Sequence, residues 1–318
     1  MKTIKNFCLF PESIKPIIRS PLFYVGDKFK LLKEILKHFP TQIATFVEPF
    51  VGGGSVFLNV EAQKFLLNDI DSYIIALHQF LCSQAENPQF FFENLENLIQ
   101  KYGFSYSYQK DVVPEKLKKL YPKTYYAHYN KKAYQALKSD FNQSSQKDML
   151  QLYLLLIYGF NRMLRFNTKG EFNLPVGNVD FNENVWQALN DYFEVIQQKE
   201  IQWFNLDYQD FLAQISLSPA DFLYFDPPYL ITFSEYNKLW GEIQEKNLIK
   251  TLNDLHQRGL RFAVSNVVSY KGRENTIFKE WAKNFKIIPI KSNYISYHDN
   301  SIKQFEEVLV CNYEKSSS

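Results

Sequence analysis

A short apolar run that stops at two prolines constrains the fold of this chain more than any other feature. Phe222-Leu223-Tyr224-Phe225 predicts a buried strand, and Asp226-Pro227-Pro228-Tyr229 follows it directly. Because proline has a fixed φ and no N–H, the sheet cannot continue past Asp226, and the Pro227 carbonyl is free to accept a hydrogen bond. The amine of a nucleobase fits such a site: it could donate to Asp226 and Pro227 while the Tyr229 ring stacks on the base. An ordinary turn is the alternative, since these dipeptides are common in turns.

A glycine cluster marks a second ligand-binding element. Residues 45–50 predict a short strand, and Val51-Gly52-Gly53-Gly54-Ser55 comes next. Glycines let the backbone turn tightly and come close to a ligand. Phe57 stands where the dinucleotide fingerprint has its third glycine, which argues against a bound pyrophosphate. We therefore predict a nucleotide-binding loop that does not take a nicotinamide dinucleotide.

Two charged residues stand at the ends of predicted elements. Asp69 follows the apolar strand 65–67, where α/β folds bind the ribose hydroxyls of a nucleotide, although a helix cap is the alternative. Lys28 precedes a helical pattern of leucine and isoleucine at positions 31, 32, 35 and 36. A cation there opposes the helix dipole, so we expect Lys28 to neutralise a ligand carboxylate, with a solvated lysine as the alternative.

Positive charge is concentrated in one part of the chain. The formal net charge is only +2, but residues 101–140 hold nine lysines against three acids, Asp111, Glu115 and Asp140. Tyrosines are interleaved with these lysines, which suits a surface that contacts phosphates and sugars, and we expect Lys118, Lys119, Lys131 and Lys132 to bind DNA. The alternative is a solvated helix face with half-buried tyrosines.

A predicted hairpin lies farther along the chain. Short strand-like pieces around Phe166 and Phe172 flank the turn Asn167-Thr168-Lys169-Gly170. We expect Arg162, Arg165 and Asn167 to project from it, because arginine suits guanine and asparagine suits adenine in the major groove. Phosphate contact is the alternative for either arginine.

Composition favours an enzyme of the reducing cytosol. The 318 residues exceed one average domain, and 46% hydrophobic content supplies ample buried cores. The three cysteines, Cys8, Cys82 and Cys311, are too scattered for a zinc site and odd in number for a disulfide framework. We expect neither a bound metal, a membrane span nor an export signal, and we predict a cytoplasmic protein associated with the nucleoid.

Taken in order, these motifs resemble one family. Tyr24-Val-Gly-Asp-Lys28, Glu48-Pro-Phe-Val-Gly-Gly-Gly-Ser55, Leu67-Asn-Asp69 and Asp226-Pro-Pro-Tyr229 resemble the Dam-like, alpha-group (D12 class) DNA adenine-N6 methyltransferases. Residues 161–167 and 170–177 are similar to a stretch in the family's DNA-recognition region. The chain departs from the pattern at Tyr24, where the family often has Trp, and at Asp27, where it often has Gly.

The resemblance implies transfer of a methyl group from S-adenosylmethionine to N6 of a flipped adenine in double-stranded DNA. It implies that Asp226, Pro227, Pro228 and Tyr229 are catalytic and that Arg165 reads a base. The residues expected to bind the cofactor are Tyr24, Lys28, Glu48, Pro49, Phe50, Gly52, Gly53, Gly54, Asp69, Asp207 and Asp226. Asp207 follows a predicted strand at 201–204, and capping of the next helix is an equal alternative for it.

Strands and helices that alternate along the chain predict an α/β fold. We expect a Rossmann-like, doubly wound and mainly parallel sheet, the S-adenosylmethionine-dependent methyltransferase fold. Residues 16–71 and 192–313 form its predicted catalytic domain. Residues 72–191 form an inserted, mostly helical target-recognition domain that contains the hairpin, and residues 314–318 form a flexible tail.

Three alternatives remain open from sequence. The substrate could be cytosine N4, RNA adenine or a protein glutamine, since these amino methyltransferases share an acid or amide followed by Pro-Pro-aromatic. A non-catalytic DNA-binding regulator is a second alternative, and a nicotinamide enzyme is a third that the missing glycine disfavours. The expected partner is double-stranded DNA, and a cognate restriction endonuclease that acts on the same site without forming a stable complex is left open.

Overall fold

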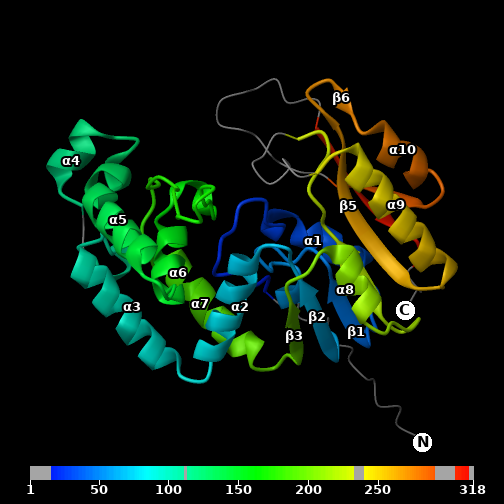
Figure 1. Cartoon of the computed structure of the whole chain (residues 1–318), viewed down its shortest axis with the longest axis horizontal. Helices are drawn as coiled ribbons and strands as arrows, with labels where there is room; N and C mark the ends of the chain where they lie inside the picture. The colour runs from blue at the N-terminus through cyan, green and yellow to red at the C-terminus, as the bar shows by residue number, and fades with distance from the viewer. Residues whose placement is uncertain (1–15, 111–112, 233–239, 291–304, 315–318) are drawn as a thin grey trace, which may run out of the picture.

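The computed structural model describes residues 16–110, 113–232, 240–290 and 305–314. Cys8 and Asp111 lie outside the described residues, as do residues 315–318 of the predicted tail. Figure 1 shows a twisted sheet on one side of the molecule and a group of helices on the other.

The central sheet has the strand order β3-β2-β1-β4-β5-β8-β7. The strands from β3 to β5 in this order are parallel, whereas β8 is antiparallel to β5 and β7 is antiparallel to β8. The strand bounds are β1 Thr45–Glu48, β2 Lys64–Asn68, β3 Ile201–Phe204, β4 Phe222–Phe225, β5 Arg261–Tyr270, β7 Lys286–Ile290 and β8 Phe305–Cys311, and the two-residue strand β6, Arg273–Glu274, pairs with β5. The prediction of an α/β fold with a central sheet is confirmed.

Alternate residues of the strands face two separate cores. Phe46, Phe222 and Tyr224 belong to one hydrophobic cluster, whereas their neighbours Val47 and Leu223 belong to the other. This follows from the two-residue repeat of a strand, which sends successive side chains to opposite faces. Because both faces are covered, these strands are almost continuously apolar, as expected for a buried parallel sheet.

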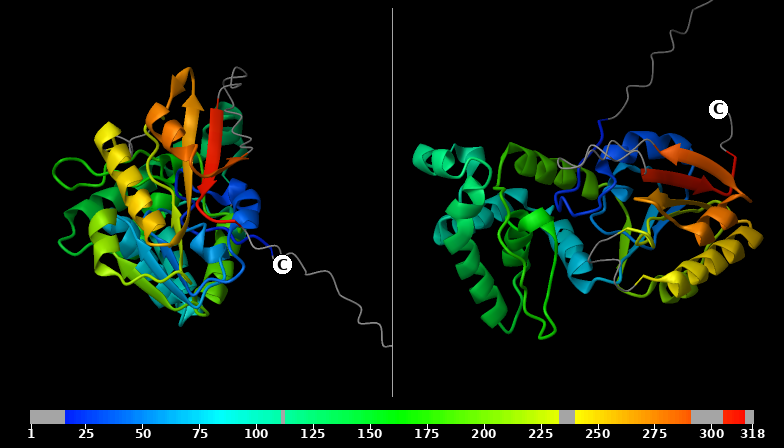
Figure 2. Two further views of the ribbon diagram at one scale, coloured as in Figure 1. Left: turned by 90° about the vertical axis from the view of Figure 1, so that its right-hand side faces the viewer. Right: turned by 90° about the horizontal axis from the view of Figure 1, so that it is seen from above.

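Different helices cover the two faces. The helices α8 (Tyr208–Gln214), α9 (Glu242–Gln257) and α10 (Thr276–Ala282) pack on one face through side chains such as Phe211, Leu252 and Phe278. The short helices η1 (Phe29–Leu31), α1 (Leu32–Ile35), η2 (Leu36–His38) and η3 (Phe57–Asn59) pack on the other face. Figure 2 shows the sheet on edge, with α9 on one side and α1 on the other.

A long helical segment joins β2 to β3. Its elements are α2 (Ser72–Gln84), α3 (Pro88–Tyr102), η4 (Ser107–Gln109), α4 (Glu115–Leu120), α5 (Tyr125–Gln143), α6 (Met149–Ile157), η5 (Phe160–Arg162) and α7 (Glu183–Ile196). The helix α6 is buried from Leu152 to Ile157, and its Tyr153 hydroxyl donates to the Pro21 carbonyl over 3.1 Å. The helical segment therefore shares its hydrophobic cluster with the sheet.

The predicted hairpin lacks regular strands. Isolated antiparallel bridges join Gly159 to Val176 and Phe166 to Phe172. Two left-handed residues, Asn161 with φ 54° and Arg162 with φ 49°, turn the chain sharply after α6. The helix α6 itself ends at Ile157, four residues before the first of them.

Among the described residues, no helix combines the length and the apolar character that a bilayer-spanning segment needs.

Candidate active site

Three acidic residues lie at the carboxyl ends of neighbouring parallel strands. Glu48 ends β1, Asp69 follows β2 and Asp226 follows β4, and β1 pairs with both of the other strands. Parallel strands end at the same edge of a sheet, which is where α/β folds bind their ligands. The sheet order therefore brings together three of the acids that the sequence singles out.

The glycine loop after β1 needs its glycines for two different reasons. Gly52 and Gly54 have φ of +46° and +77°, which disfavour any residue with a side chain. A Cβ on Gly53 would lie 2.8 Å from the Cβ of Tyr24, and a Cβ on Gly54 would lie 2.4 Å from the Phe57 ring. Tyr24 is thus packed directly against the loop and is only 8% exposed.

Two side chains hold the Gly52 peptide from opposite sides. The Asp69 carboxylate accepts from the Gly52 N–H over 2.9 Å and from the Asp71 N–H over 3.0 Å. The His78 ring of α2 contacts the Gly52 carbonyl through Nε2 over 2.8 Å, so Nε2 carries the proton. Burial raises the pKa of Asp69 to about 6 and lowers the pKa of His78 to about 4. Asp69 supports the loop and does not cap α2, because Asp71 is the cap.

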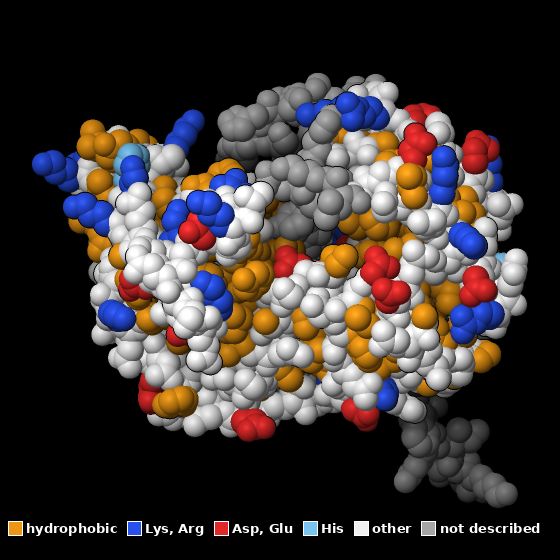
Figure 3. Space-filling view, viewed as in Figure 1, with side chains coloured by type: hydrophobic (Ala, Val, Ile, Leu, Met, Phe, Trp, Pro, Cys, Tyr) orange, Lys and Arg blue, Asp and Glu red, His pale blue; other side chains and the backbone are white. Residues whose placement is uncertain are grey.

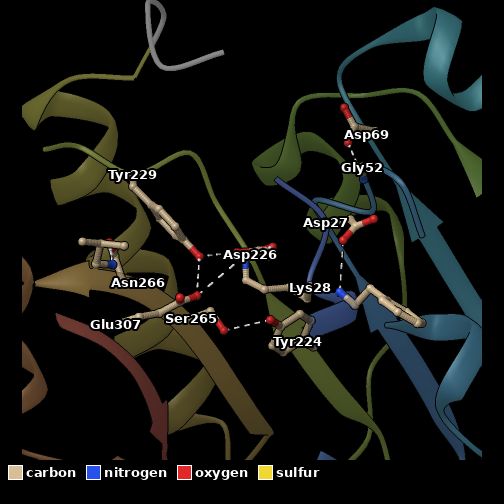
Figure 4. Close-up of polar contacts among 12 residues, drawn as sticks. Asp27, Lys28, Gly52, Asp69, Tyr224, Asp226, Tyr229, Ser265, Asn266 and Glu307 are labelled. Atoms are coloured by element: carbon tan, nitrogen blue, oxygen red, sulfur yellow. Dashed lines mark hydrogen bonds and ion pairs between the residues drawn. The ribbon is translucent and has the colours of Figure 1, made fainter. Parts of the chain in front are cut away.

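The Asp226 carboxylate is engaged on both oxygens. Lys28 Nζ lies 2.7 Å from Oδ2, and the Tyr229 hydroxyl donates to Oδ1 over 2.9 Å. Glu307 of β8 completes the cluster, with Oε1 lying 3.2 Å from the Tyr229 hydroxyl and 3.9 Å from Lys28 Nζ (Figure 4). The Lys28 ammonium also lies 5.1 Å from the centre of the Tyr229 ring.

Lys28 therefore has a different partner from the one expected. We predicted a ligand carboxylate, but the side chain is buried and forms an ion pair with Asp226 of the protein itself. The solvated alternative is wrong, because Lys28 is buried. Contact with a ligand carboxylate stays a prediction.

Glu48 is a buried acid beside this cluster. It is 2% exposed, and its Oε2 atom has no hydrogen-bond partner among the described residues. Burial and the neighbouring Asp226 carboxylate raise the pKa of Glu48 well above its usual range. Without a cationic ligand, Glu48 is therefore expected to hold a proton.

The remaining predicted cofactor residues, Pro49, Phe50 and Asp207, follow strands β1 and β3 at the same edge of the sheet. The Pro49 carbonyl accepts from the Asn68 amide over 3.0 Å, and the Phe50 ring packs 5.1 Å from the Tyr208 ring. Asp207 is exposed and caps α8 by accepting from the Gln209 N–H over 2.8 Å. The described residues donate no hydrogen bond to the Pro227 carbonyl, and Pro227 itself is buried.

The structure corrects the placement of two predicted DNA-binding residues. Arg162 does not project from the hairpin, because its guanidinium lies over the Phe23 ring at 4.2 Å, opposite Arg19 at 4.4 Å. Burial lowers the pKa of Arg162 to about 10. Asn167 is used within the turn, where its Oδ1 accepts from the N–H groups of Lys169 and Glu171 and its Nδ2 donates to Glu171.

Arg165 remains at the surface of the hairpin but is braced. Its Nε donates to Asn173 Oδ1 over 2.8 Å, and its Nη2 donates to the Asn173 carbonyl over 2.9 Å. The next residue, Phe166, stacks on Tyr73 of α2 with the ring centres 4.0 Å apart. The hairpin is thus attached to the first turn of α2.

The predicted basic surface lies mainly on α4 and α5, whose lysine side chains lie at the upper left of Figure 3. Lys119, Lys131 and Lys132 are exposed, and Lys118 is paired with Glu115 over 2.7 Å. Several of the interleaved tyrosines belong to the core instead: Tyr106 and Tyr134 are buried, and their hydroxyls donate to Glu96 and to the Leu155 carbonyl. For these two tyrosines the expected phosphate contact is wrong.

Two residues of the site escaped the analysis of the sequence. Glu307 could have been noticed as an acid directly before the apolar run 308–311 of its strand. His78 carried no signal, since a single histidine on an apolar helix face is common. The described residues contain no group of three or more His, Cys, Asp or Glu placed to hold a metal.

The fold and this site define a methyltransferase class. Residues 24–295 match the sequence profile of the D12 class N6 adenine-specific DNA methyltransferases, and the chain belongs to this family. The resemblance inferred from the motifs is confirmed.

The chain is also similar to individual proteins. The chain is 33% identical over 322 residues to the type II methyltransferase M.FokI of Planomicrobium okeanokoites, an alignment that covers 98% of this chain and 46% of the relative. It is 34% identical to the modification methylase StsI of Streptococcus sanguinis, with 95% and 44% covered. It is 27% identical to the DNA adenine methylase of Escherichia coli strain K12, with 92% and 94% covered. The chain thus spans less than half the length of the first two relatives.

Proposed function

We propose that this protein transfers a methyl group from S-adenosylmethionine to N6 of adenine in double-stranded DNA. One observation carries the proposal: the Asp226 carboxylate and the Pro227 carbonyl end β4 beside the glycine loop that ends β1. An amine that donates to both acceptors would face whatever the loop binds. Membership of the D12 class supports adenine as the base.

The residues at the glycine loop fit the cofactor. A Cβ on Gly53 or Gly54 would collide with Tyr24, Phe57 or His78 of the protein itself, whereas a Cβ on Gly52 would meet no atom within 4 Å, so a ligand can approach the backbone of the loop at Gly52. Glu48 offers an unpartnered buried carboxyl oxygen, and Asp69 offers a second acid at the next strand. S-adenosylmethionine carries positive charge and ribose hydroxyls that such acids attract, and when bound it supplies an electrophilic methyl group. The residues that we assign to its binding are Tyr24, Lys28, Glu48, Pro49, Phe50, Gly52, Gly53, Gly54, Asp69, Asp207 and Asp226.

The catalytic residues act on the amine of the base. A base stacked in a duplex cannot reach the Pro227 carbonyl, so the adenine must be flipped out, at a cost of a few kcal/mol. Acceptors at Asp226 and Pro227 would favour a more pyramidal N6, whose lone pair is less delocalised into the ring and points toward the methyl group. An N–C bond would form as the S–C bond of the donor breaks, S-adenosylhomocysteine would be the leaving group, and one N6 proton would be released to water. Positioning and electrostatics provide the rate enhancement.

The helical segment is proposed as the DNA-recognition region. Residues 72–191 carry the exposed Lys119, Lys131 and Lys132, which suit phosphate contacts, and the hairpin with Arg165, which retains donors suited to a guanine edge. Two relatives are named as a type II methyltransferase and a modification methylase, which supports a role in restriction-modification beside an endonuclease acting on the same site. This role would place the protein at the nucleoid.

A labelled-methyl assay tests the proposal. We would incubate the protein with labelled S-adenosylmethionine and duplex DNA, RNA or a protein fraction, and identify the methylated base by mass spectrometry. The expected product is N6-methyladenine in DNA. Methylated cytosine, RNA or protein without N6-methyladenine in DNA would contradict the assignment of the substrate.

Two variants locate the chemistry. Asp226→Ala should abolish methylation while S-adenosylmethionine still binds in calorimetry, because the amine acceptor is lost and the glycine loop remains. Asp254→Ala, an exposed acid on α9, is the matched control and should react at the wild-type rate. Methylation by Asp226→Ala at a rate near wild type would refute the role of Asp226.

A further inference from the structure

The hydrogen bonds of the Tyr229 hydroxyl indicate that one of the two neighbouring carboxyl groups is protonated. The hydroxyl oxygen lies 2.9 Å from Asp226 Oδ1 and 3.2 Å from Glu307 Oε1. A hydroxyl has one proton to donate, and an ionised carboxylate can only accept. One proton shared between two ionised carboxylates would give two weak three-centre bonds between like charges, whereas a protonated carboxyl that donates to the Tyr229 oxygen makes both contacts full hydrogen bonds.

Glu307 is the better place for this proton. Asp226 has the Lys28 ammonium 2.7 Å from its Oδ2, whereas Glu307 lies 3.9 Å from the same nitrogen. The Glu307 side chain is 2% exposed, compared with 19% for Asp226. An ion pair favours the charged form of a carboxyl and burial disfavours it, so the two carboxyls separate into an ionised Asp226 and a neutral Glu307.

The sheet register explains the burial of Glu307. Its partners across the sheet are Val267 of β5 and Ile290 of β7, and directly opposed residues of antiparallel strands point to the same face. Both neighbours are buried and apolar. Burial accordingly raises the pKa of Glu307, and the pKa of Tyr229 is also raised, so that the phenol keeps its proton.

We propose that Glu307, in its neutral form, is a positioning residue for methyl transfer: it donates to the Tyr229 oxygen, Tyr229 donates to Asp226, and Lys28 is left to neutralise Asp226 alone. The proposal rests on the function proposed above. It assigns to β8 control over the charge and orientation of the amine acceptor, although Glu307 itself contacts neither Pro227 nor the base.

The pH dependence of the cluster follows from this arrangement. Among the described residues, the charged and titratable groups that face Glu307 are Lys28, Asp226, Tyr229 and, on β4, Tyr224. When Glu307 ionises, it loses the proton that it donates, attracts the Tyr229 hydroxyl and competes with Asp226 for Lys28. Methyl transfer should therefore fall as the pH rises through the pKa of Glu307.

Three variants separate the neutral from the charged form. Glu307→Gln replaces the protonated carboxyl with a neutral amide of the same shape that still donates to Tyr229. Glu307→Leu fills the space between Val267 and Ile290 but cannot donate. Glu306→Gln, on the exposed face of the same strand, is the matched control.

The first measurement does not depend on activity. Infrared difference spectra of the full chain at pH 6, wild type minus variant, should show the loss of one protonated-carboxyl component in Glu307→Gln and no such loss in Glu306→Gln, while the contributions of Glu48 and Asp69 are common to all three proteins. A band that persists unchanged in Glu307→Gln overturns the proposal. Because this experiment needs neither DNA nor cofactor, it decides the position of the proton even if the protein methylates no DNA, which would be a failure of the proposed function instead.

The second measurement is the rate of methyl transfer as a function of pH. Glu307→Gln should keep the turnover rate within about threefold of wild type and lose the decline at high pH, whereas Glu307→Leu should lose about tenfold, the equivalent of one hydrogen bond. The KM for S-adenosylmethionine should stay unchanged in both variants. If Glu307 acts as an anion, Glu307→Gln will be as slow as Glu307→Leu, and the wild-type turnover rate at saturating S-adenosylmethionine will fall on acidification. Either result overturns the proposal.

Discussion

Buried His78 should make the stability of this protein depend on pH. Its ring is 1% exposed, stacks on Trp203 with the ring centres 4.8 Å apart, and donates to the Gly52 carbonyl. Burial lowers the pKa of His78 from the ordinary 6.5 to about 4. Between these two pH values the histidine is protonated in the unfolded chain but largely neutral in the folded chain. The free energy of unfolding therefore falls as the pH drops below 6.5.

The size of the effect follows from the two pKa values. A difference of about 2.5 pKa units corresponds to about 3 kcal/mol when it is complete. At pH 5 an unfolded histidine is almost fully protonated while His78 is mostly neutral, so about 2 kcal/mol of the free energy of unfolding is lost relative to pH 8.

Two variants that do not titrate isolate this contribution. His78→Gln can still donate to Gly52, whereas His78→Phe keeps the aromatic packing and leaves the carbonyl unpaired, at a cost of about 1 to 3 kcal/mol at pH 8. Because the acidic groups titrate in all three proteins, their effects cancel in the differences. Each variant should gain about 2 kcal/mol on wild type between pH 8 and pH 5.

Urea unfolding followed by circular dichroism and tryptophan fluorescence measures these differences, and coincident transitions of the two probes justify a two-state treatment. If the wild-type and variant free energies differ by the same amount at pH 8 and pH 5, to within about 0.5 kcal/mol, the argument that His78 is buried in its neutral form fails.

Two further predictions concern the glycine loop. Gly54→Ala should weaken S-adenosylmethionine binding in calorimetry and lower the free energy of unfolding by about 1 to 3 kcal/mol, because the new Cβ combines a φ of +77° with contacts at 2.4 Å to Phe57 and 2.7 Å to His78; a fully stable variant with wild-type affinity would contradict the geometry of the loop. The affinity of the wild type for S-adenosylmethionine should fall as the pH drops below about 6, the pKa of Asp69, since a protonated Asp69 is a poorer acceptor for Gly52 and the ribose. Asp69→Asn should remove that pH step, and a step that persists in the variant would assign it to another group.

Sequence alone locates what depends on local chain chemistry. Asp226, Glu48 and Asp69 are found because each stands at the end of an apolar run, the first two directly before a proline, and parallel strands must bring such ends to one edge. Glu307 could not be paired with Tyr229 in this way, since the pairing requires β8 to lie between β5 and β7 in the register that opposes Glu307 to Val267 and Ile290.

The hairpin shows where local patterns mislead. Arg162 and Asn167 have the right chemistry for base contacts, but neither side chain is free. Two consecutive left-handed residues turn Arg162 back onto Phe23, and the turn itself consumes the hydrogen bonds of Asn167. Such backbone conformations are rare for residues with a side chain, and the sequence around residues 161–162 does not predict them.

The helix α2 touches both halves of the molecule. In its first turn Tyr73 stacks on Phe166 of the hairpin, and five residues later His78 donates to the carbonyl of Gly52. Because α2 contacts both the hairpin and the glycine loop, a displacement of the hairpin that moved α2 would also move the loop. Suppose that a molecule bound at the hairpin changes the affinity of the loop for its ligand. The ligand must then change the affinity of the hairpin for that molecule by the same factor.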